Sequence, residues 1–190
     1  MFIDYLTLLL TNLSAGMFIL AAYVYKGLDD PDQKRWVPAF SVVGFIALLG
    51  GLNLVLNWPL PGIYNIAFGE TSVLFGTLML AASFALAFSW DLSILALYAI
   101  FAGVFALEVG WRIIDLGLTT QPLLSGAAFA LTGISGVFSL VVLRFKKNKV
   151  YRSFFALVLS VGAVLWAVTA YPALWSHFET FSKWVPYSMR

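Results

Sequence analysis

Residues 38–57 read PAFSVVGFIALLGGLNLVLN, twenty residues without a charged side chain. A bilayer core about 30 Å thick needs roughly 20 helical residues for one crossing, so this stretch has the length and composition of a transmembrane helix. Apolar stretches of similar length take up most of the remaining chain. We expect membrane spans at about 4–25, 38–57, 66–89, 92–115, 121–143 and 152–172.

The composition agrees with this expectation. Of 190 residues, 62% are hydrophobic and 11% are charged, and the mean hydropathy is +0.93. A soluble domain with these values would have too little polar surface to cover itself. Backbone polar groups in lipid must bond within their own segment, so we predict an all-α, polytopic membrane protein: a six-transmembrane-helix bundle that forms one domain over residues 1–190.

Other functional classes are excluded by what the chain lacks. It has no cysteine, which excludes disulfides and Cys-ligated metals. Its net charge of +2 is too small to indicate a nucleic-acid partner. His177 is the only histidine, so a His-rich zinc site and a bis-histidine haem are excluded, and we expect no cofactor.

The distribution of Lys and Arg predicts the orientation. Loops one, three and five hold eight of these residues, namely Lys26, Lys34, Arg35, Arg144, Lys146, Lys147, Lys149 and Arg152. The opposite side holds Arg112, Lys183 and Arg190. The positive-inside rule then places the odd loops in the cytoplasm and both termini outside. The start, Met1 to Asp4, lacks the basic residues of a cleavable signal peptide, so we expect the first span to be retained.

The tail after the sixth span has its own pattern. Apolar side chains recur there at helical spacing, at Leu174, Trp175, Phe178, Phe181 and Trp184. This pattern predicts a short interfacial helix over about 173–185 on the outer membrane surface. A lone histidine in such a helix is most often solvated, and we expect this of His177.

The fourth span carries the sharpest polar signal. Glu108, Arg112 and Asp115 are spaced four and three apart, so they share one helix face and Arg112 can pair with both carboxylates. Charges at membrane depth are costly and normally face the bundle interior. The alternatives are a purely structural ion pair or, for Arg112 and Asp115, side chains that reach the membrane surface.

Further polar residues lie in the same outer half. Glu70 opens the third span, where a carboxylate is also favoured simply by the helix N-terminus. Asn53, Asn57 and Asn65 offer neutral oxygens, although interhelical hydrogen bonding explains such amides equally well. We predict a binding pocket formed by Glu70, Glu108, Arg112, Asp115, Asn53, Asn57 and Asn65, with Glu70 and Glu108 as the ligands if it holds a metal.

This pocket predicts the binding, and by extension the translocation, of a small cation, proton or polar solute. One alternative is an accessory or structural subunit of a larger, for example respiratory, membrane complex. Another is an intramembrane enzyme that uses the two glutamates as acid and base, although we lean against an enzyme. The expected partners are the lipid bilayer, and other membrane subunits or a second copy of this chain; nucleic acid is not expected.

The stretch 58–70, WPLPGIYNIAFGE, resembles the signature of a prokaryotic membrane-protein family known as domain of unknown function nine-eight-one. The resemblance implies a short multi-span protein of a prokaryotic cytoplasmic membrane. It also implies that this loop and Glu70 are a family hallmark. It carries no activity, and leaves open whether the hallmark binds a ligand or shapes the fold.

Overall fold

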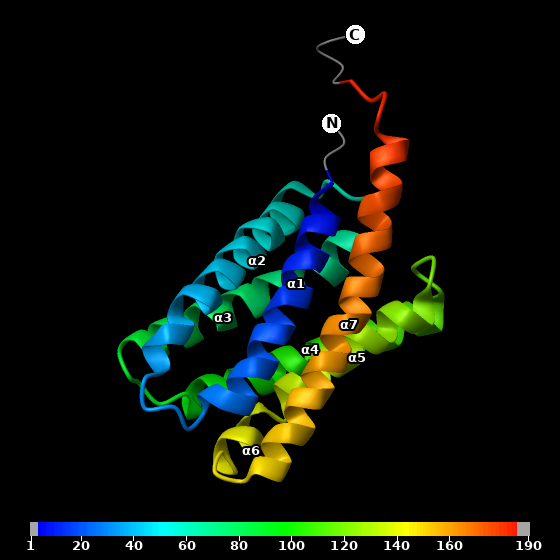
Figure 1. The fold of residues 1–190 in the computed structure, drawn as a ribbon. Helices are drawn as coiled ribbons and strands as arrows, with labels where there is room; N and C mark the ends of the chain where they lie inside the picture. Colours follow the sequence, from blue (N-terminus) through cyan, green and yellow to red (C-terminus); the bar gives the residue numbers. More distant parts are fainter. Residues whose placement is uncertain (1–3, 186–190) are drawn as a thin grey trace.

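The computed structural model describes residues 4–185, and helices are the only regular structure among them (Figure 1). The α-helices are α1 (Tyr5–Ala22), α2 (Val37–Asn57), α3 (Thr71–Ala87), α4 (Ser93–Leu116), α5 (Pro122–Val137), α6 (Ser139–Arg144) and α7 (Lys149–Thr180). Shorter helices are the π-helices η1 (Tyr23–Gly27) and η3 (Asn65–Glu70) and the 3-10 helix η2 (Gln33–Trp36). The predicted all-α fold class is confirmed.

Most of these helices are long and apolar enough to cross a membrane. Five segments meet this description: Leu6–Gly27, Gln33–Asn57, Asn65–Ala87, Ser93–Leu116 and Lys149–Thr180. The α5 helix is shorter, but α6 follows it after a single break at Phe138. Together α5 and α6 occupy the stretch for which we predict the fifth span. A count of six crossings stays a prediction.

The helices pack as three antiparallel pairs: α2 with α3, α4 with α5, and α1 with α7. The α1–α7 pair lies in the middle, because α1 also contacts α2 and α7 also contacts α5 (Figure 1). The helices α3 and α4 are neighbours in sequence yet touch each other far less than the paired helices do. The bundle is therefore a ring of helices with its loosest contact between α3 and α4.

Two of the pairs are held by glycines spaced seven residues apart. In α2 and α3, Gly44 lies against Gly76 and Gly51 lies against Gly69. In α4 and α5, the equivalent contacts are Gly103 with Gly133 and Gly110 with Gly126. Seven residues are close to two helical turns, so the glycines of each helix lie on one face. Small residues on such a face let two backbones approach closely within a membrane.

The structure corrects the prediction of a separate interfacial helix over about 173–185. The α7 helix runs without a break from Lys149 to Thr180, with Pro172 inside it, and extends beyond the other helices (Figure 1). A proline removes one backbone donor and bends a helix, but it does not have to end it. No glycine follows Pro172 in α7 to stop the helix.

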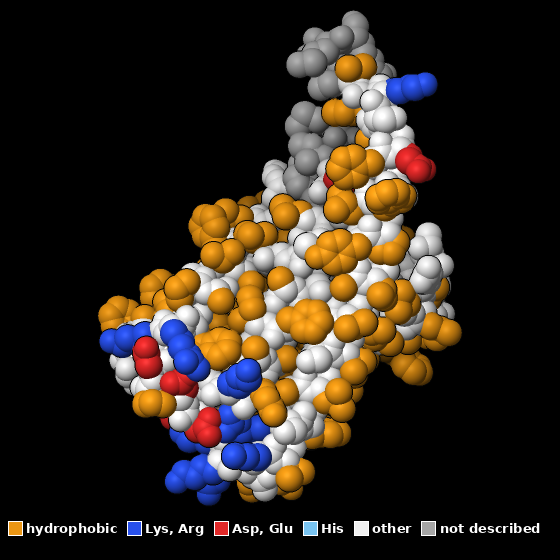
Figure 2. Space-filling view, in the orientation of Figure 1, with side chains coloured by type: hydrophobic (Ala, Val, Ile, Leu, Met, Phe, Trp, Pro, Cys, Tyr) orange, Lys and Arg blue, Asp and Glu red, His pale blue; other side chains and the backbone are white. Residues whose placement is uncertain are grey.

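The ends of the bundle differ in charge. The start of α1 and the end of α7 lie at the same end (Figure 1). Lys and Arg side chains gather at the opposite end, and hydrophobic side chains cover the surface between (Figure 2). We predict the orientation of the bundle in the membrane from this distribution of Lys and Arg. Which end faces the cytoplasm stays a prediction.

Candidate functional site

A cavity of about 220 Å³ lies inside the ring of helices. Along α1 and the turn after it, its wall extends from Leu9 to Leu28, roughly 28 Å at 1.5 Å per residue. All seven α-helices contribute to the wall, which is mostly Leu, Ala, Phe and Met. The cavity is therefore long, narrow and apolar.

The two sides of the cavity are not equally covered. Wall residues from α1 and α7 such as Met17, Leu159 and Trp166 are buried. Most wall residues from α3, such as Leu78, are half-buried, whereas α4 contributes half-buried residues such as Leu95 and buried ones such as Ala106. The less buried part of the wall thus lies beside the loosest helix contact, that between α3 and α4.

Several hydroxyl groups line the cavity, and most of them donate their hydrogen to a backbone carbonyl. Thr132 donates to Ala128, Ser135 donates to Leu131, and Ser139 donates to Ala96. Thr71 and Tyr23 also donate within the protein. The Nε1–H of Trp166 donates to the Thr132 hydroxyl over 3.0 Å.

Asn12 is the amide side chain in this wall. Its residue is 8% exposed, and its Nδ2 donates to the Val43 carbonyl of α2 over 3.0 Å. A carbonyl can only accept, so this bond fixes which end of the amide is nitrogen. No described residue donates to Asn12 Oδ1.

At the end of the bundle where the basic residues gather, Arg152 joins the beginning of α7 to the end of the first helix. Its Nε donates to the Val24 carbonyl over 2.8 Å, and its Nη2 donates to the Tyr25 carbonyl. The guanidinium also pairs with Asp29 over 2.6 Å. The last carbonyls of a helix lack partners within the helix, and Arg152 supplies them here.

The Arg152 side chain is 4% exposed. Arg152 is one of the eight loop charges from which we predict the orientation, and the structure buries it. The hydrogen bond from Arg152 lowers the pKa of the Asp29 carboxyl. Arg152 also donates to the nearby Lys146 carbonyl over 3.4 Å. The local sequence does not mark its contacts with Val24 and Tyr25, because these lie 128 and 127 residues earlier in the chain.

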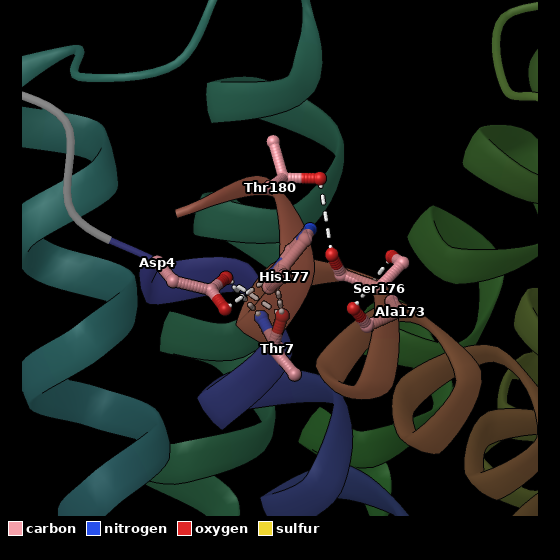
Figure 3. A network of polar contacts seen from close by, with 6 residues as sticks. All are labelled: Asp4, Thr7, Ala173, Ser176, His177 and Thr180. Carbon is pink, nitrogen blue, oxygen red and sulfur yellow. Dashed lines mark hydrogen bonds and ion pairs between the residues drawn. The ribbon is translucent and has the colours of Figure 1, made fainter. Parts of the chain in front are cut away.

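At the opposite end, Asp4, Thr7 and His177 form a cluster (Figure 3). His177 Nδ1 lies 2.5 Å from Asp4 Oδ2, and the Thr7 hydroxyl donates to Asp4 Oδ1 over 2.6 Å. An ionised carboxylate only accepts, so His177 Nδ1 carries the hydrogen. This corrects the expectation that His177 is simply solvated: it connects α7 to the start of α1.

The ionisation of Asp4 makes this connection sensitive to pH. Burial raises the pKa of the Asp4 carboxyl, but hydrogen bonds from Thr7 and His177 outweigh burial and hold the pKa below its usual range. A carboxyl with a lowered pKa in the folded state stabilises the fold above its unfolded value, about 3.9, and loses that contribution as the pH falls through the folded value.

We therefore expect Asp4→Asn to lower the thermal unfolding midpoint at neutral pH, and the difference from the parent to shrink as the pH falls below the unfolded value, about 3.9. Asp32→Asn, which changes an exposed carboxylate in the first loop, is the matched control. Its unfolding midpoint should not approach that of the parent as the pH falls. A difference between Asp4→Asn and the parent that persists unchanged in acid would contradict the assignment.

The structure places the residues of the predicted pocket at one end of the bundle but mostly pairs them locally. Arg112 binds Asp115 over 2.5 Å, and both side chains are exposed. Glu108, on the same helix, is exposed and has no ion pair with Arg112. Asn57 donates to Asn53 Oδ1 over 2.7 Å.

Asn65 forms hydrogen bonds within the loop that precedes η3. It is fully buried, accepts from the Leu60 backbone N–H, and donates to the carbonyls of Leu60 and Gly62. These bonds close the loop that carries the two prolines. Asn65 thus stabilises this loop, and its predicted role as a pocket residue stays a prediction.

Glu70 ends η3 and is half-buried. None of the seven predicted pocket residues lines the central cavity. Among the described residues there is no group of three or more His, Asp and Glu side chains that could hold a metal ion. The binding role of these residues stays a prediction.

The helices and their apolar surface define a polytopic, all-α membrane protein. Within this class, the chain belongs to the family described as "Protein of unknown function (DUF981)", whose family model matches residues 1–180. No curated protein and no solved structure matches the chain.

The structure shows which contacts the 58–70 stretch makes. Asn65 closes its loop, and the Tyr64 hydroxyl donates to the Leu118 carbonyl, which connects this loop to the one after α4. Gly69 packs against Leu54 and Gly51 of α2. These contacts shape the fold, one of the two roles that the resemblance leaves open.

Proposed function

We propose that this protein binds a long apolar molecule, with the character of a lipid chain, inside its helix bundle. The observation that carries the proposal is the cavity itself, which is narrow and follows α1 from Leu9 to Leu28. Cavities lined by Leu, Ile and Phe stay dry and accept apolar ligands. A single hydrocarbon chain fits the length and the lining of this cavity.

The arrangement of the helices supports access from the bilayer. The half-buried wall and the weakest helix contact coincide between α3 and α4. A chain that reaches the cavity by this route never has to leave an apolar environment. The predicted polar pocket would need a ligand to enter from water instead.

Filling the cavity tests the proposal. Ala102 lies in the α4 wall, and Ala102→Phe adds a ring to the space that a ligand needs. The purified protein is kept in a bile-salt-type detergent, which has no linear chain to compete, and its thermal unfolding is followed with added hexadecane. At about a hundredfold excess over the Kd, one site stabilises the parent by about 2.7 kcal/mol.

The Ala102→Phe protein should lose this ligand-dependent stabilisation. Val104→Phe is the matched control, because Val104 is two residues away, does not line the cavity and is 52% exposed. It should respond to hexadecane like the parent. Equal responses of the parent and both variants would overturn the proposal.

The second candidate is the sequence-based one, binding of a small cation, proton or polar solute at the outer end. It is favoured by the Tyr64–Leu118 hydrogen bond, which brings the loop before Glu70 close to the end of the helix that carries Glu108. It ranks second because Arg112 and Asp115 are exposed and paired with each other. A role as a subunit of a larger membrane complex likewise stays a prediction.

A further inference from the structure

We infer that the ligand of the central cavity carries a hydroxyl group, and that Asn12 binds this group; the inference rests on the proposed function above. It names the chemical class of the ligand: a long-chain alcohol, a hydrocarbon chain that ends in a hydrogen-bond donor.

The first step is the state of Asn12. Asn12 is 8% exposed, and its amide oxygen is not one of the fully enclosed atoms that lack a partner, so this oxygen stays accessible although it has no donor. The Val43 carbonyl holds its nitrogen on the side of α2. The amide oxygen, which has no donor among the described residues, is left on the cavity wall to which Asn12 belongs.

The second step is the balance of donors and acceptors around the cavity. Thr71, Thr132, Ser135 and Ser139 use their hydroxyl hydrogens on backbone carbonyls. Each of these oxygens keeps acceptor capacity. Ser72 is the one hydroxyl in the wall without a hydrogen bond to a described residue. The wall therefore offers more acceptors than donors.

This balance selects the head group. A ketone or an ether only accepts and leaves the Asn12 oxygen without a partner. A hydroxyl donates to Asn12 Oδ1 and can still accept a hydrogen bond from the remaining donors. The apolar wall disfavours a charged carboxylate, because the described wall residues include no cation to pair with it.

The experiment compares hexadecanol with hexadecyl methyl ether, which has the same chain but no donor, by thermal unfolding titrations in the same detergent. In the parent, hexadecanol should bind about tenfold more tightly than the ether, as expected for one additional hydrogen bond in an apolar site. Asn12→Leu should reduce this ratio to about one while the ether still binds.

Ser14→Ala is the matched control. Ser14 lies in the same helix and also donates to a backbone carbonyl, that of Ala163, but it does not line the cavity. The alcohol preference should survive this change. Comparing the ratio between variants cancels the different partitioning of the two ligands into detergent. If Asn12→Leu does not fold, Asn12→Ala removes the same amide oxygen and takes its place in the comparison.

The outcomes separate the two proposals. Equal affinity for alcohol and ether in the parent, or an alcohol preference that persists in Asn12→Leu, overturns the role of Asn12 and leaves chain binding intact. Binding of neither compound overturns the proposed function and the inference with it.

Discussion

Arg152→Met is expected to lower the free energy of unfolding by about 3 kcal/mol, because removing one partner of a buried charged interaction typically costs about 3–5 kcal/mol. The cost lies at the lower end because the partner Asp29 is 53% exposed and can be solvated by water. The carbonyls of Val24 and Tyr25 lose their donor, and α7 loses its attachment to the end of the first helix. Detergent-induced unfolding of the purified protein measures the change.

Two companion variants separate geometry from charge. Arg152→Lys keeps the charge, but a lysine ammonium cannot bind both carbonyls and Asp29 as the planar guanidinium does. This variant should therefore recover less than half of the unfolding free energy that Arg152→Met loses. Asp29→Asn should cost far less than Arg152→Met, as usual for exposed ion pairs. An Arg152→Met protein as stable as the parent would show that this attachment does not matter.

The second large effect is expected at the α4–α5 contact. A Cβ atom on Gly103 would lie 2.6 Å from the Gly133 carbonyl oxygen, and one on Gly133 would lie 2.6 Å from the Gly103 oxygen. Both neighbours are backbone, so neither can rotate away. Gly103→Val should therefore destabilise the fold by at least about 2 kcal/mol, since overpacking a tight contact costs about 1–3 kcal/mol or more.

The same unfolding assay checks this value. Val104→Leu, at the next residue but on the exposed face of α4, should change stability by less than about 0.5 kcal/mol. If Gly103→Val unfolds at the same detergent concentration as Val104→Leu, the close contact of α4 and α5 is not what holds this pair together.

The fold class could be predicted because hydrophobic length is a local property. The apolar run 38–57 predicts a helix that the structure gives as Val37–Asn57. The tail could not be predicted in the same way, because the length of an apolar stretch does not show where its helix ends. The α7 helix continues through Pro172 to Thr180, although most of its residues after Pro172 are exposed.

The polar side chains were harder to predict, because their roles depend on contacts between distant segments. Sequence reasoning placed Glu108, Arg112 and Asp115 on one face correctly, but could not show that this face is exposed. It missed Asn12 altogether, since a single asparagine in an apolar run gives no spacing to interpret.

The Asp4–His177 contact offered a weak signal. We predict both chain ends on one side of the membrane, so an acid near the first residues and the lone histidine near the last ones were available to each other. The glycines in 44–76 and 103–133 repeat at a spacing of seven residues, which is visible in the sequence. These glycines lie where the two closely packed helix pairs touch.

The most direct test of the central claim is to identify what the protein carries when it is isolated from a membrane. Native mass spectrometry of the purified chain should show one long-chain alcohol bound per protein, lost in Ala102→Phe and kept in Val104→Phe. If the parent and the Ala102→Phe protein instead carry the same variable mixture of membrane lipids, the cavity does not bind a ligand and the account is wrong.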